Sequence, residues 1–456
     1  MILDTLKNVL ANYPTTSLVV AYSGGVDSQV LLHALTILKN KNLINHSISA
    51  CHINHGLSKN AEDWQIFAKQ QCDQYGIAYS TYAVVVEKQP RQSLEAIARE
   101  KRYQVLEKYS DEQSLVLTGH HQDDQVETFL LALKRGSGLK GLSAMAVHSP
   151  FGDKQQAILR PFLSCSRQEI VDYANENGLQ WVEDESNQDT QFDRNFLRQV
   201  ILPEFQQRWT SINQTIVRSA QHCQDAQNIL DEIAEQDIAR CAVEKNILEV
   251  EALTQLSVPR FNQVIRYLLA QHNFLMPSLA QLSQLHQQLF AEDDKSPEVK
   301  LGEVWLRKYK KHLYLTKTFQ PLESWQYELD ITDKSIIDEP ITLPDELGQL
   351  IFSTNDALSI DDTGQNITIP KLCKRLSISF THINPICLPE YRQHSRVLKK
   401  VLQELNIPPW QRKRLPFLYL DGELAAVIGK FTCKPFLINK SSSVGRKINV
   451  HWLGQA

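Results

Sequence analysis

The sequence predicts an α/β protein whose first part is a parallel β-sheet with helices on both faces. Three regions of different character along the 456 residues support this. Between Ser17 and Asn187, short apolar runs alternate with amphipathic segments, which is the order that builds a parallel sheet. Residues 216–295 are rich in Gln, Leu and Ala and lack strand runs, which indicates a small helical domain. Residues 372–456 mix strands with a basic helix, which indicates a C-terminal α+β domain.

Residue type and spacing predict the strands and helices of the first region. Runs of β-branched and other apolar residues predict strands, and apolar positions that recur every three to four residues predict helices. The motif Ser166-x-x-Glu169 is a capping box, so a helix should begin there. The expected strands are 17–23, 46–54, 77–86, 114–121 and 157–163, and the expected helices are 27–39, 61–76, 93–109, 123–134 and 166–177.

Changes in composition and charge set the expected domain boundaries. Residues 321–370 carry 11 Asp and Glu but only one basic residue, Lys334. Residues 389–456 carry 12 Lys and Arg against 4 Asp and Glu, so this end of the chain is suited to a polyanion. We expect a catalytic domain at 1–215, a helical domain ending in a short hairpin at 216–318, an acidic connector at 319–371 and a basic domain at 372–456.

The composition of the whole chain excludes several classes of protein. The net charge is −4, so the chain as a whole is not a polycation. Its eight cysteines form no C-x-x-C pair, which argues against a zinc ribbon or a dithiol redox motif and fits reduced thiols. No run approaches the ~18 apolar residues that a membrane span needs, and the N-terminus does not resemble a signal peptide. We expect a cytoplasmic protein with no membrane partner.

The stretch VVAYSGGVDSQVLL (19–32) joins the first strand to the first helix of the expected sheet. The adjacent Gly24 and Gly25 allow positive φ and a close approach of a ligand to the backbone. The following helix presents N–H groups and the positive end of its dipole, and Ser23 and Ser28 add hydroxyl groups. These features predict a phosphate-binding loop; the alternative is an ordinary strand–turn–helix junction.

Asp27 is the unexpected member of this loop, because a carboxylate repels a phosphate unless a cation lies between them. We therefore expect Asp27 to ligate a magnesium ion or to order the loop. The lysine of a Walker A loop, which would hold the β- and γ-phosphates, is absent. The loop is better suited to a free pyrophosphate.

The order of the motifs resembles one family of enzymes. Ser23-Gly24-Gly25-x-Asp27-Ser28 resembles the pyrophosphate loop of the N-type ATP pyrophosphatases, the PP-loop superfamily with its Rossmann-like fold, whose members cleave ATP between the α- and β-phosphates and adenylate a substrate oxygen. Together with the motifs that follow, the chain resembles the tRNA(Ile)-lysidine synthase family over roughly residues 15–205, and residues 398–429 resemble the last domain of its long, three-domain form. These motifs are HINHGL (52–57), TGHHQDDQVET (118–128), RGSGLKGL (135–142), RPFL (160–163), EDESN (183–187) and RNFLR (194–198).

The resemblance implies a reaction in two steps. The chain would ligate free L-lysine to C2 of the wobble cytidine in the CAU anticodon of tRNA(Ile), with ATP as co-substrate and Mg²⁺ as cofactor. The cytidine O2 would attack the α-phosphate, and the lysine ε-amine would then displace AMP to give lysidine. The implied ATP-binding residues are Ser23, Gly24, Gly25, Val26, Asp27, Ser28, His52, Thr118, Gly119 and His120.

A cluster of polar residues after the fourth strand has the chemistry that the second step needs. A lysine ammonium is no nucleophile until it loses a proton, so one carboxylate must hold it and one must take its proton. Asp123 and Glu127 are four residues apart and are expected to share a helix face. A structural zinc site and an acidic first turn that suits the helix dipole are the alternatives. The implied catalytic residues are Asp27, Asp123, Asp124 and Glu127.

Basic residues outside the loop are expected to bind tRNA or its phosphates. For Arg194 and Arg198 this expectation comes from the resemblance, which implies that the pair lies at the rim of the active site. The alternatives are a plain helix C-cap for Arg135, a solvated helix face for Arg194 and Arg198, and an ordinary charged surface for the C-terminal group. The expected residues are Arg135, Arg194, Arg198, Lys399, Lys400, Arg412, Lys413 and Arg414.

Two other functions remain open at the level of sequence. A PP-loop tRNA thiolase would use the same loop, but such enzymes commonly carry a C-x-x-C pair, which is absent here. A non-catalytic RNA-binding protein that kept the loop is the second. A homodimer is left open as well.

Overall fold

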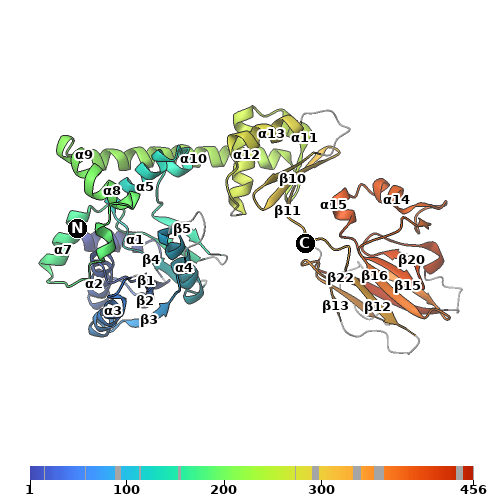
Figure 1. Ribbon diagram of the computed structural model, residues 1–456, viewed down its shortest axis with the longest axis horizontal. Coiled ribbons are helices and arrows are strands. Elements are labelled where there is room, and N and C mark those ends of the chain that lie inside the picture. The colour runs from blue at the N-terminus through green and yellow to red at the C-terminus, as the bar shows by residue number, and fades with distance from the viewer. Residues whose placement is uncertain are drawn as a thin grey trace. The chain divides into compact units, whose positions relative to one another are not determined.

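The computed structural model divides the chain into two compact units, residues 1–233 and 234–456, which are considered separately (Figure 1). The expected helix start at residue 93 and the last residue of the motif 52–57 lie outside the described part of the chain. The structure describes residues 1–14, 16–56, 58–87, 94–111, 114–152, 156–272, 274–289, 297–331, 340–353, 364–437 and 445–454.

The first unit is built on a six-stranded sheet in the order β3-β2-β1-β4-β6-β5 (Figure 1). Its neighbouring strands are parallel except for β5 and β6, which form an antiparallel pair at one edge. This confirms the predicted α/β class. The strands are β1 (Ser17–Ala21), β2 (Ile48–Asn54), β3 (Ala78–Ala83), β4 (Ser114–Leu117), β5 (His148–Phe151) and β6 (Gln156–Leu159).

Helices cover both faces of this sheet because each strand directs apolar side chains to both sides. On one face, Leu18 and Val20 of β1 share a core with the buried residues of α1, α2, α3 and α7. On the other face, Val19 packs in a second core with Leu106 of α4. The helices are α1 (Ile2–Leu10), α2 (Val26–Asn40), α3 (Ala61–Tyr75), α4 (Leu94–Tyr109) and α7 (Arg167–Glu176).

A second group of helices follows β4 and packs beyond the carboxyl ends of the strands. Helix α5 (Gln122–Lys134) shares a small apolar core with Leu202 and Ile216 from later helices. The segment α8–η2–α9 is one run of helical backbone interrupted by a π-helical turn. These elements are α6 (Leu139–Leu142), η1 (Glu185–Gln188), α8 (Asp193–Phe196), η2 (Leu197–Ile201), α9 (Leu202–Arg208) and α10 (Ile212–Cys241).

The second unit begins with helices packed on a five-stranded antiparallel sheet, in the order β7-β8-β11-β10-β9. The predicted hairpin is β10–β11. The expectation that residues 216–295 hold no strand is wrong, because β7 and β8 lie there and β8 pairs with β11. The elements are β7 (Ala242–Glu244), β8 (Ile247–Glu249), α11 (Val250–Thr254), α12 (Val258–Gln271), α13 (Leu279–Leu289), β9 (Glu298–Leu301), β10 (Val304–Tyr309) and β11 (His312–Lys317).

The rest of the second unit consists of strands in antiparallel sheets with two short helices. The expected acidic connector is not a connector in its described residues, because β12 pairs with β16 and β15 pairs with β22 inside the C-terminal core. The elements are β12 (Gln326–Asp330), β13 (Ile341–Thr342), β14 (Gln349–Ser353), β15 (Gln365–Pro370), β16 (Arg375–Ser379), β17 (Ile386–Cys387), β18 (Arg396–Val397), α14 (Leu398–Glu404), α15 (Pro409–Arg412), β19 (Phe417–Leu420), β20 (Glu423–Val427), β21 (Phe431–Thr432), η3 (Lys434–Phe436) and β22 (Gly445–Leu453).

Candidate active site

The strand order places three of the predicted motifs at one edge of the sheet. Strand β1 lies between β2 and β4, with Ala21 opposite Cys51 and Val20 opposite Leu117. Because parallel strands end on the same side, the loop after β1, the end of β2 and the turn after β4 meet there. Ligands of open α/β sheets bind beyond these carboxyl ends.

The glycine loop turns sharply between β1 and α2. Gly24 has a φ of +85°, and Gly25 is the N-cap of α2 with an extended backbone. The Ser28 hydroxyl donates to the Gly25 carbonyl at 3.0 Å and lies 3.1 Å from the Ser23 hydroxyl. The Val182 backbone N–H donates to the Gly24 carbonyl at 3.0 Å, so the segment just before residues 183–187 holds the loop in place. The loop has the form expected of a phosphate cradle at a helix N-terminus.

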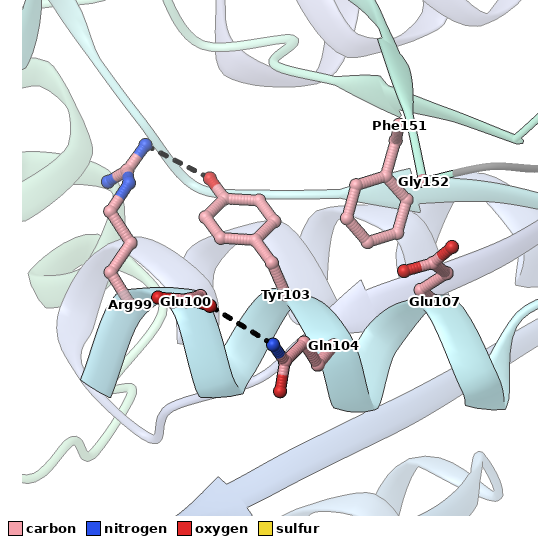
Figure 2. A pocket seen from close by; sticks show the side chains of 7 residues that line it. All are labelled: Arg99, Glu100, Tyr103, Gln104, Glu107, Phe151 and Gly152. Carbon is pink, nitrogen blue, oxygen red and sulfur yellow. Dashed lines mark hydrogen bonds between the residues drawn. The ribbon is translucent and has the colours of Figure 1, made fainter. Parts of the chain in front are cut away.

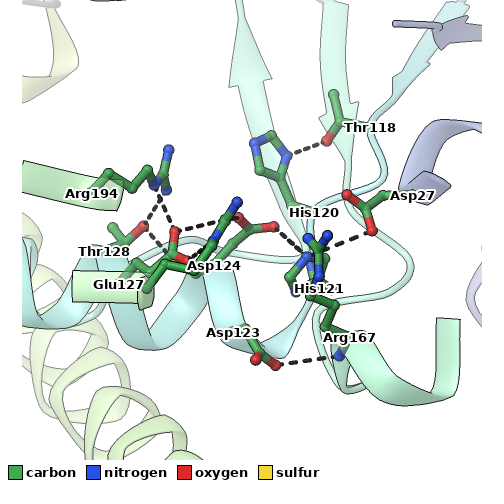
Figure 3. A network of polar contacts seen from close by, with 11 residues as sticks. Asp27, Thr118, His120, His121, Asp123, Asp124, Glu127, Thr128, Arg167 and Arg194 are labelled. Atoms are coloured by element: carbon green, nitrogen blue, oxygen red, sulfur yellow. Dashed lines mark hydrogen bonds and ion pairs between the residues drawn. The ribbon is translucent and has the colours of Figure 1, made fainter. Parts of the chain in front are cut away.

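Asp27 lies in the first turn of α2 and faces the turn after β4 (Figure 3). Its Oδ1 is buried without a hydrogen-bond partner among the described residues, and it lies 3.6 Å from Nε2 of the fully buried His121. Burial raises the pKa of Asp27, and the neighbouring His121 opposes that shift. A carboxylate oxygen left without a donor in this position is suited to a cation that arrives with a substrate.

The turn after β4 positions two histidines and a glycine beside Asp27. The Thr118 hydroxyl lies 2.7 Å from Nδ1 of His120. Burial lowers the pKa of His120 to about 3; Asp124 opposes this, and Arg160 adds to it, so the imidazole is neutral near pH 7. The expected strand 114–121 ends at residue 117, and the remaining residues form this turn.

His52 lies at the end of β2, next to the loop. Its Nδ1 is 2.9 Å from the Tyr22 carbonyl oxygen, so Nδ1 carries the proton and donates it. The ring is buried, and burial lowers the pKa of His52. In this position the neutral ring fixes the backbone of the residue just before the glycine loop.

The central feature of the site is a buried carboxylate held by two arginines (Figure 3). Glu127 is fully buried, and its Oε1 accepts from Arg198 Nε at 2.6 Å while its Oε2 accepts from Arg194 Nε at 2.8 Å. Arg198 Nη2 also donates to Asp124 Oδ1 at 3.3 Å. Burial raises the pKa of Glu127, and Arg198 opposes that shift most strongly. The motif at 194–198 is therefore bonded directly to the motif at 118–128.

Asp123 and Glu127, both on α5, have different partners. Asp123 Oδ1 accepts from the backbone N–H of Arg167 at 3.3 Å, at the start of α7 (Figure 3). Asp124 and Glu127 share a donor, because both accept from Arg198. Asp124 Oδ2 also lies 3.5 Å from His121 Nε2, so His121 stands between Asp124 and Asp27.

Helix α4 supplies arginines that sequence analysis missed. Arg99 and Arg102 lie 5.1 Å and 5.7 Å from the ring centre of Tyr103, and the charges of Arg99, Arg102 and Arg160 all act on His120. A depression of about 430 Å³ along α4 is lined in part by Arg99, Tyr103 and Phe151 (Figure 2). The sequence run AREKRY (98–103) could have revealed these arginines, because two arginines three residues apart fall on one face of a helix.

The remaining predicted tRNA residues fall into different environments. Arg135 is exposed beyond the end of α5, and its Nε donates to the Leu131 carbonyl at 3.1 Å. Lys399, Lys400 and Lys413 are exposed. In contrast, Arg412 donates to the Ile407 carbonyl at 2.7 Å and to the Tyr309 hydroxyl, and the largely buried Arg414 is ion-paired with Asp345. Arg414 is thus committed to packing within the second unit.

Family models match three parts of the chain. A PP-loop domain matches residues 2–205, a TilS substrate binding domain matches 248–314 and a TilS substrate C-terminal domain matches 376–452. A solved U34-tRNA thiolase, NcsA from Methanococcus maripaludis, is 18% identical with a TM-score of 0.40 and covers 48% of this chain and 76% of its own.

Curated relatives match nearly the whole chain. A tRNA(Ile)-lysidine synthase from Histophilus somni (strain 129Pt) is 38% identical over 435 residues, 94% of this chain and 99% of the relative. One from Vibrio parahaemolyticus is 39% identical over 448 residues, 97% and 98% of the two chains. The sheet, the glycine loop and the matching domain define a PP-loop ATP-binding protein. The chain belongs to the tRNA(Ile)-lysidine synthase family, which confirms the resemblance seen in its motifs.

Proposed function

We propose that this chain uses ATP to join the ε-amine of free L-lysine to C2 of the wobble cytidine in the CAU anticodon of tRNA(Ile), giving lysidine, AMP and pyrophosphate. The enzyme is accordingly an ATP-dependent ligase of its family. One observation carries the mechanism: His121 Nε2 lies 3.6 Å from Asp27 Oδ1 and 3.5 Å from Asp124 Oδ2. The glycine loop and the carboxylate cluster therefore form one site, in which an intermediate made at the loop is within reach of the amine.

The first step is transfer of the adenylyl group to the tRNA. The cytidine O2 attacks the α-phosphorus of ATP, a new P–O bond forms, and the bond to the β-phosphate oxygen breaks. The released pyrophosphate is held by the loop at Gly24 and Gly25 and by the start of α2, where backbone N–H groups and the helix dipole favour an anion. We assign the neutral His120 and the Thr118 hydroxyl, which lie 2.7 Å apart in the turn after β4, to the same nucleotide pocket.

The second step is attack of the lysine amine on the activated C2. The N–C2 bond forms, the C2–O2 bond breaks, and AMP leaves with the oxygen. We assign the lysine ammonium to Asp124, because its Oδ2 lies 3.5 Å from His121 Nε2, the atom that also adjoins Asp27, so this carboxyl group is the member of the 123–127 turn nearest the glycine loop through His121. Burial acts to raise the pKa of Asp124, but the neighbouring His121, the hydrogen bond from the His121 backbone N–H and the charge of Arg194 act to lower it, so the carboxyl group is ionised when it meets the ammonium. The proton lost by the amine passes to the carboxylates of the 123–127 turn.

The residues present fit a magnesium ion bound together with ATP. Among the described residues no group of three or more His, Cys, Asp or Glu side chains is arranged to hold a metal alone. Mg²⁺ is usually bound by one or two carboxylates together with substrate phosphates, which matches the unpartnered Asp27 Oδ1. When bound, the ion would neutralise charge on the phosphates. Asp27 would hold it, and this also explains why a carboxylate lies beside a phosphate loop.

The tRNA is the polyanionic partner. Exposed Arg135 in the catalytic unit and exposed Lys399, Lys400 and Lys413 in the second unit are our candidates for phosphate contacts. Arg194 and Arg198 keep further guanidinium N–H groups beside the site, and we assign them to the adenylate or the anticodon phosphates. No helix in the described part of the chain is long and apolar enough to span a membrane.

Two buried cysteines of the catalytic unit do not suit the thiolase alternative. Cys51 and Cys72 of the catalytic unit are fully buried, and burial raises the pKa of each thiol to about 12. A cysteine that carries sulfur must be accessible and must form a thiolate easily, whereas Cys51 and Cys72 are inaccessible and stay protonated near pH 7.

A single assay tests the proposed function. The protein is mixed with ATP, labelled lysine and total tRNA, and lysine bound to tRNA is measured. A lysidine synthase incorporates lysine, whereas a thiolase or a non-catalytic RNA-binding protein does not. Absence of lysine in the tRNA would refute the proposal.

A further inference from the structure

Three apolar side chains on the helical segment α8–η2 are left in solvent. Phe192, Phe196 and Val200 are 36%, 43% and 41% exposed. Phe192 is the N-cap of α8, Phe196 is the last residue of α8, and Val200 lies in the π-helical η2. Their spacing of four residues places them near one side of this segment. We call these three side chains the 192–200 face. None of them belongs to the hydrophobic clusters of the described residues, so packing within the first unit does not account for them.

The same helix contacts the catalytic carboxylates with its other side. Arg194 falls two residues from both Phe192 and Phe196. Arg198 falls two residues from both Phe196 and Val200, and this spacing is about half a turn of helix. Their guanidinium groups bond Glu127 at 2.8 Å and 2.6 Å. One short helix therefore presents cations to the reaction site and aromatic rings to the solvent beside that site.

Exposed cations adjoin the 192–200 face. Lys134 Nζ lies 2.7 Å from both carboxylate oxygens of Asp193, which ties the end of α5 to the start of α8. The exposed Arg135 follows immediately, and the exposed Lys140 lies in α6, just after the glycine-containing turn at 136–138. Rings and cations thus occur together at this rim of the site.

We propose that the 192–200 face binds unstacked bases of the anticodon loop that flank the wobble cytidine, while Arg135 and Lys140 contact the adjoining phosphates. This inference rests on the proposed function and adds the surface on which the RNA lies. A single-stranded RNA loop offers flat bases and an anionic backbone, and aromatic rings beside cations are the matching surface. Seating these bases on the outer side of the helix brings the cytidine between them to Glu127, Asp124 and the glycine loop.

The test compares the kinetics of surface variants in the full-length enzyme. In the double variant Phe192→Ala/Phe196→Ala, we expect KM for tRNA to rise roughly 10-fold, as the loss of base stacking predicts. KM for ATP and for lysine and the melting temperature should stay unchanged. Ile229→Ala in α10 is the matched control, because that side chain is 58% exposed on the same unit and away from the site motifs, and it should leave all constants unchanged.

Two further variants separate stacking from general apolar contact. Phe196→Trp keeps an aromatic ring and should preserve KM for tRNA, whereas Phe196→Leu should raise it. Equal values for the Trp and Leu variants, or no change in the double variant, would overturn the proposal. It would also fall if the double variant altered the oligomeric state with KM for tRNA unchanged, because the face would then join two copies of the chain. If the wild-type enzyme attached no lysine to tRNA, the proposed function would fail instead.

Discussion

Gly119 lies against the backbone of Asp27 so closely that a Cβ at position 119 would be 2.8 Å from the carbonyl carbon and oxygen of Asp27. This contact joins the turn after β4 to the glycine loop after β1. The contact brings His121 next to Asp27, and so the groups that serve the two steps of the reaction lie in one pocket. A residue without a side chain is therefore required at this contact for steric reasons.

Replacing Gly119 by alanine should separate these two loops. The added methyl group meets backbone on Asp27, which cannot yield as a flexible side chain would, so we expect a loss of about 1–3 kcal/mol in unfolding free energy. The rate of pyrophosphate release in the presence of tRNA should fall at least ~100-fold, because a displacement of reacting groups by about 1 Å slows a reaction by that factor. Gly138→Ala is the control, since its φ is −75° and its added Cβ has no neighbour within 4 Å. Equal activity in the two variants would contradict the steric account.

Asp27→Asn should abolish activity and at the same time stabilise the protein. Burial raises the pKa of Asp27, so the folded state binds this proton more tightly than the unfolded state. Stability from this group is therefore lost as the pH rises from about 4 through the raised pKa, and at pH 7 the ionised carboxyl group destabilises the fold. Without ATP and with a chelator present, Asn should raise Tm at pH 7 by roughly 2–4 °C, and the gain should shrink at low pH. A fall in Tm at pH 7, or normal pyrophosphate release, would contradict the assignment.

Arg198→Met should destabilise the fold through Glu127. Removing one partner leaves a buried carboxyl group with less compensation, which costs about 3–5 kcal/mol. Burial raises the pKa of Glu127 and Arg198 opposes that shift, so in the variant the Glu127 carboxyl group should bind its proton at a higher pH than in the wild type. The destabilisation should therefore be larger at pH 8 than at pH 5, measured by urea unfolding. The double variant Glu127→Gln/Arg198→Met should recover part of the loss, and the exposed Arg135→Met should show none.

The C-terminal basic residues should divide into binding and structural groups. The double variant Lys399→Gln/Lys400→Gln should weaken tRNA binding and reduce the slope of log binding constant against log salt concentration by about 1–2. Its Tm should stay unchanged, because both side chains are exposed. Arg414→Ala should lower the stability of the second unit by about 3 kcal/mol, because it removes the guanidinium partner of the largely buried Asp345 carboxylate and, among the described residues, leaves it only the Gln320 backbone N–H. Calorimetry and filter binding of the two variants give the comparison. If the folded Arg414 variant lost tRNA affinity and the Lys399/Lys400 variant did not, this division into binding and structural residues would be contradicted.

The sequence was sufficient to predict the parallel strands of the sheet and the glycine loop, but not the antiparallel edge strand β5. Buried parallel strands have a clear composition, and Gly24, Gly25 and Asp27 stand where a strand meets a helix, so their place at the sheet edge follows from the fold class. The choice of Asp124 over Asp123 did not follow, because it depends on where α5 begins. Its N-cap is His121, whose backbone N–H donates to Asp124 at 3.0 Å.

Contacts between distant segments were also beyond prediction. Glu127 and Arg198 are 71 residues apart, and only the packing of α8 and η2 beside α5 reveals their bond. The strands within 319–371 were missed because β12 alternates exposed acidic positions with half-buried ones, which resembles a solvated linker. Its partner β16 supplies the fully buried Leu376 and Ile378 of that sheet.

The central claim is that the adenylyl group is carried by the tRNA and not by lysine. The direct measurement is a single-turnover reaction of the enzyme with α-labelled ATP and tRNA(Ile) in the absence of lysine, followed by addition of lysine. Our account predicts label in the tRNA and release of pyrophosphate before lysine is added, then release of labelled AMP and formation of lysidine. Label that reaches lysine in the absence of tRNA, or pyrophosphate release that requires lysine but not tRNA, would contradict it.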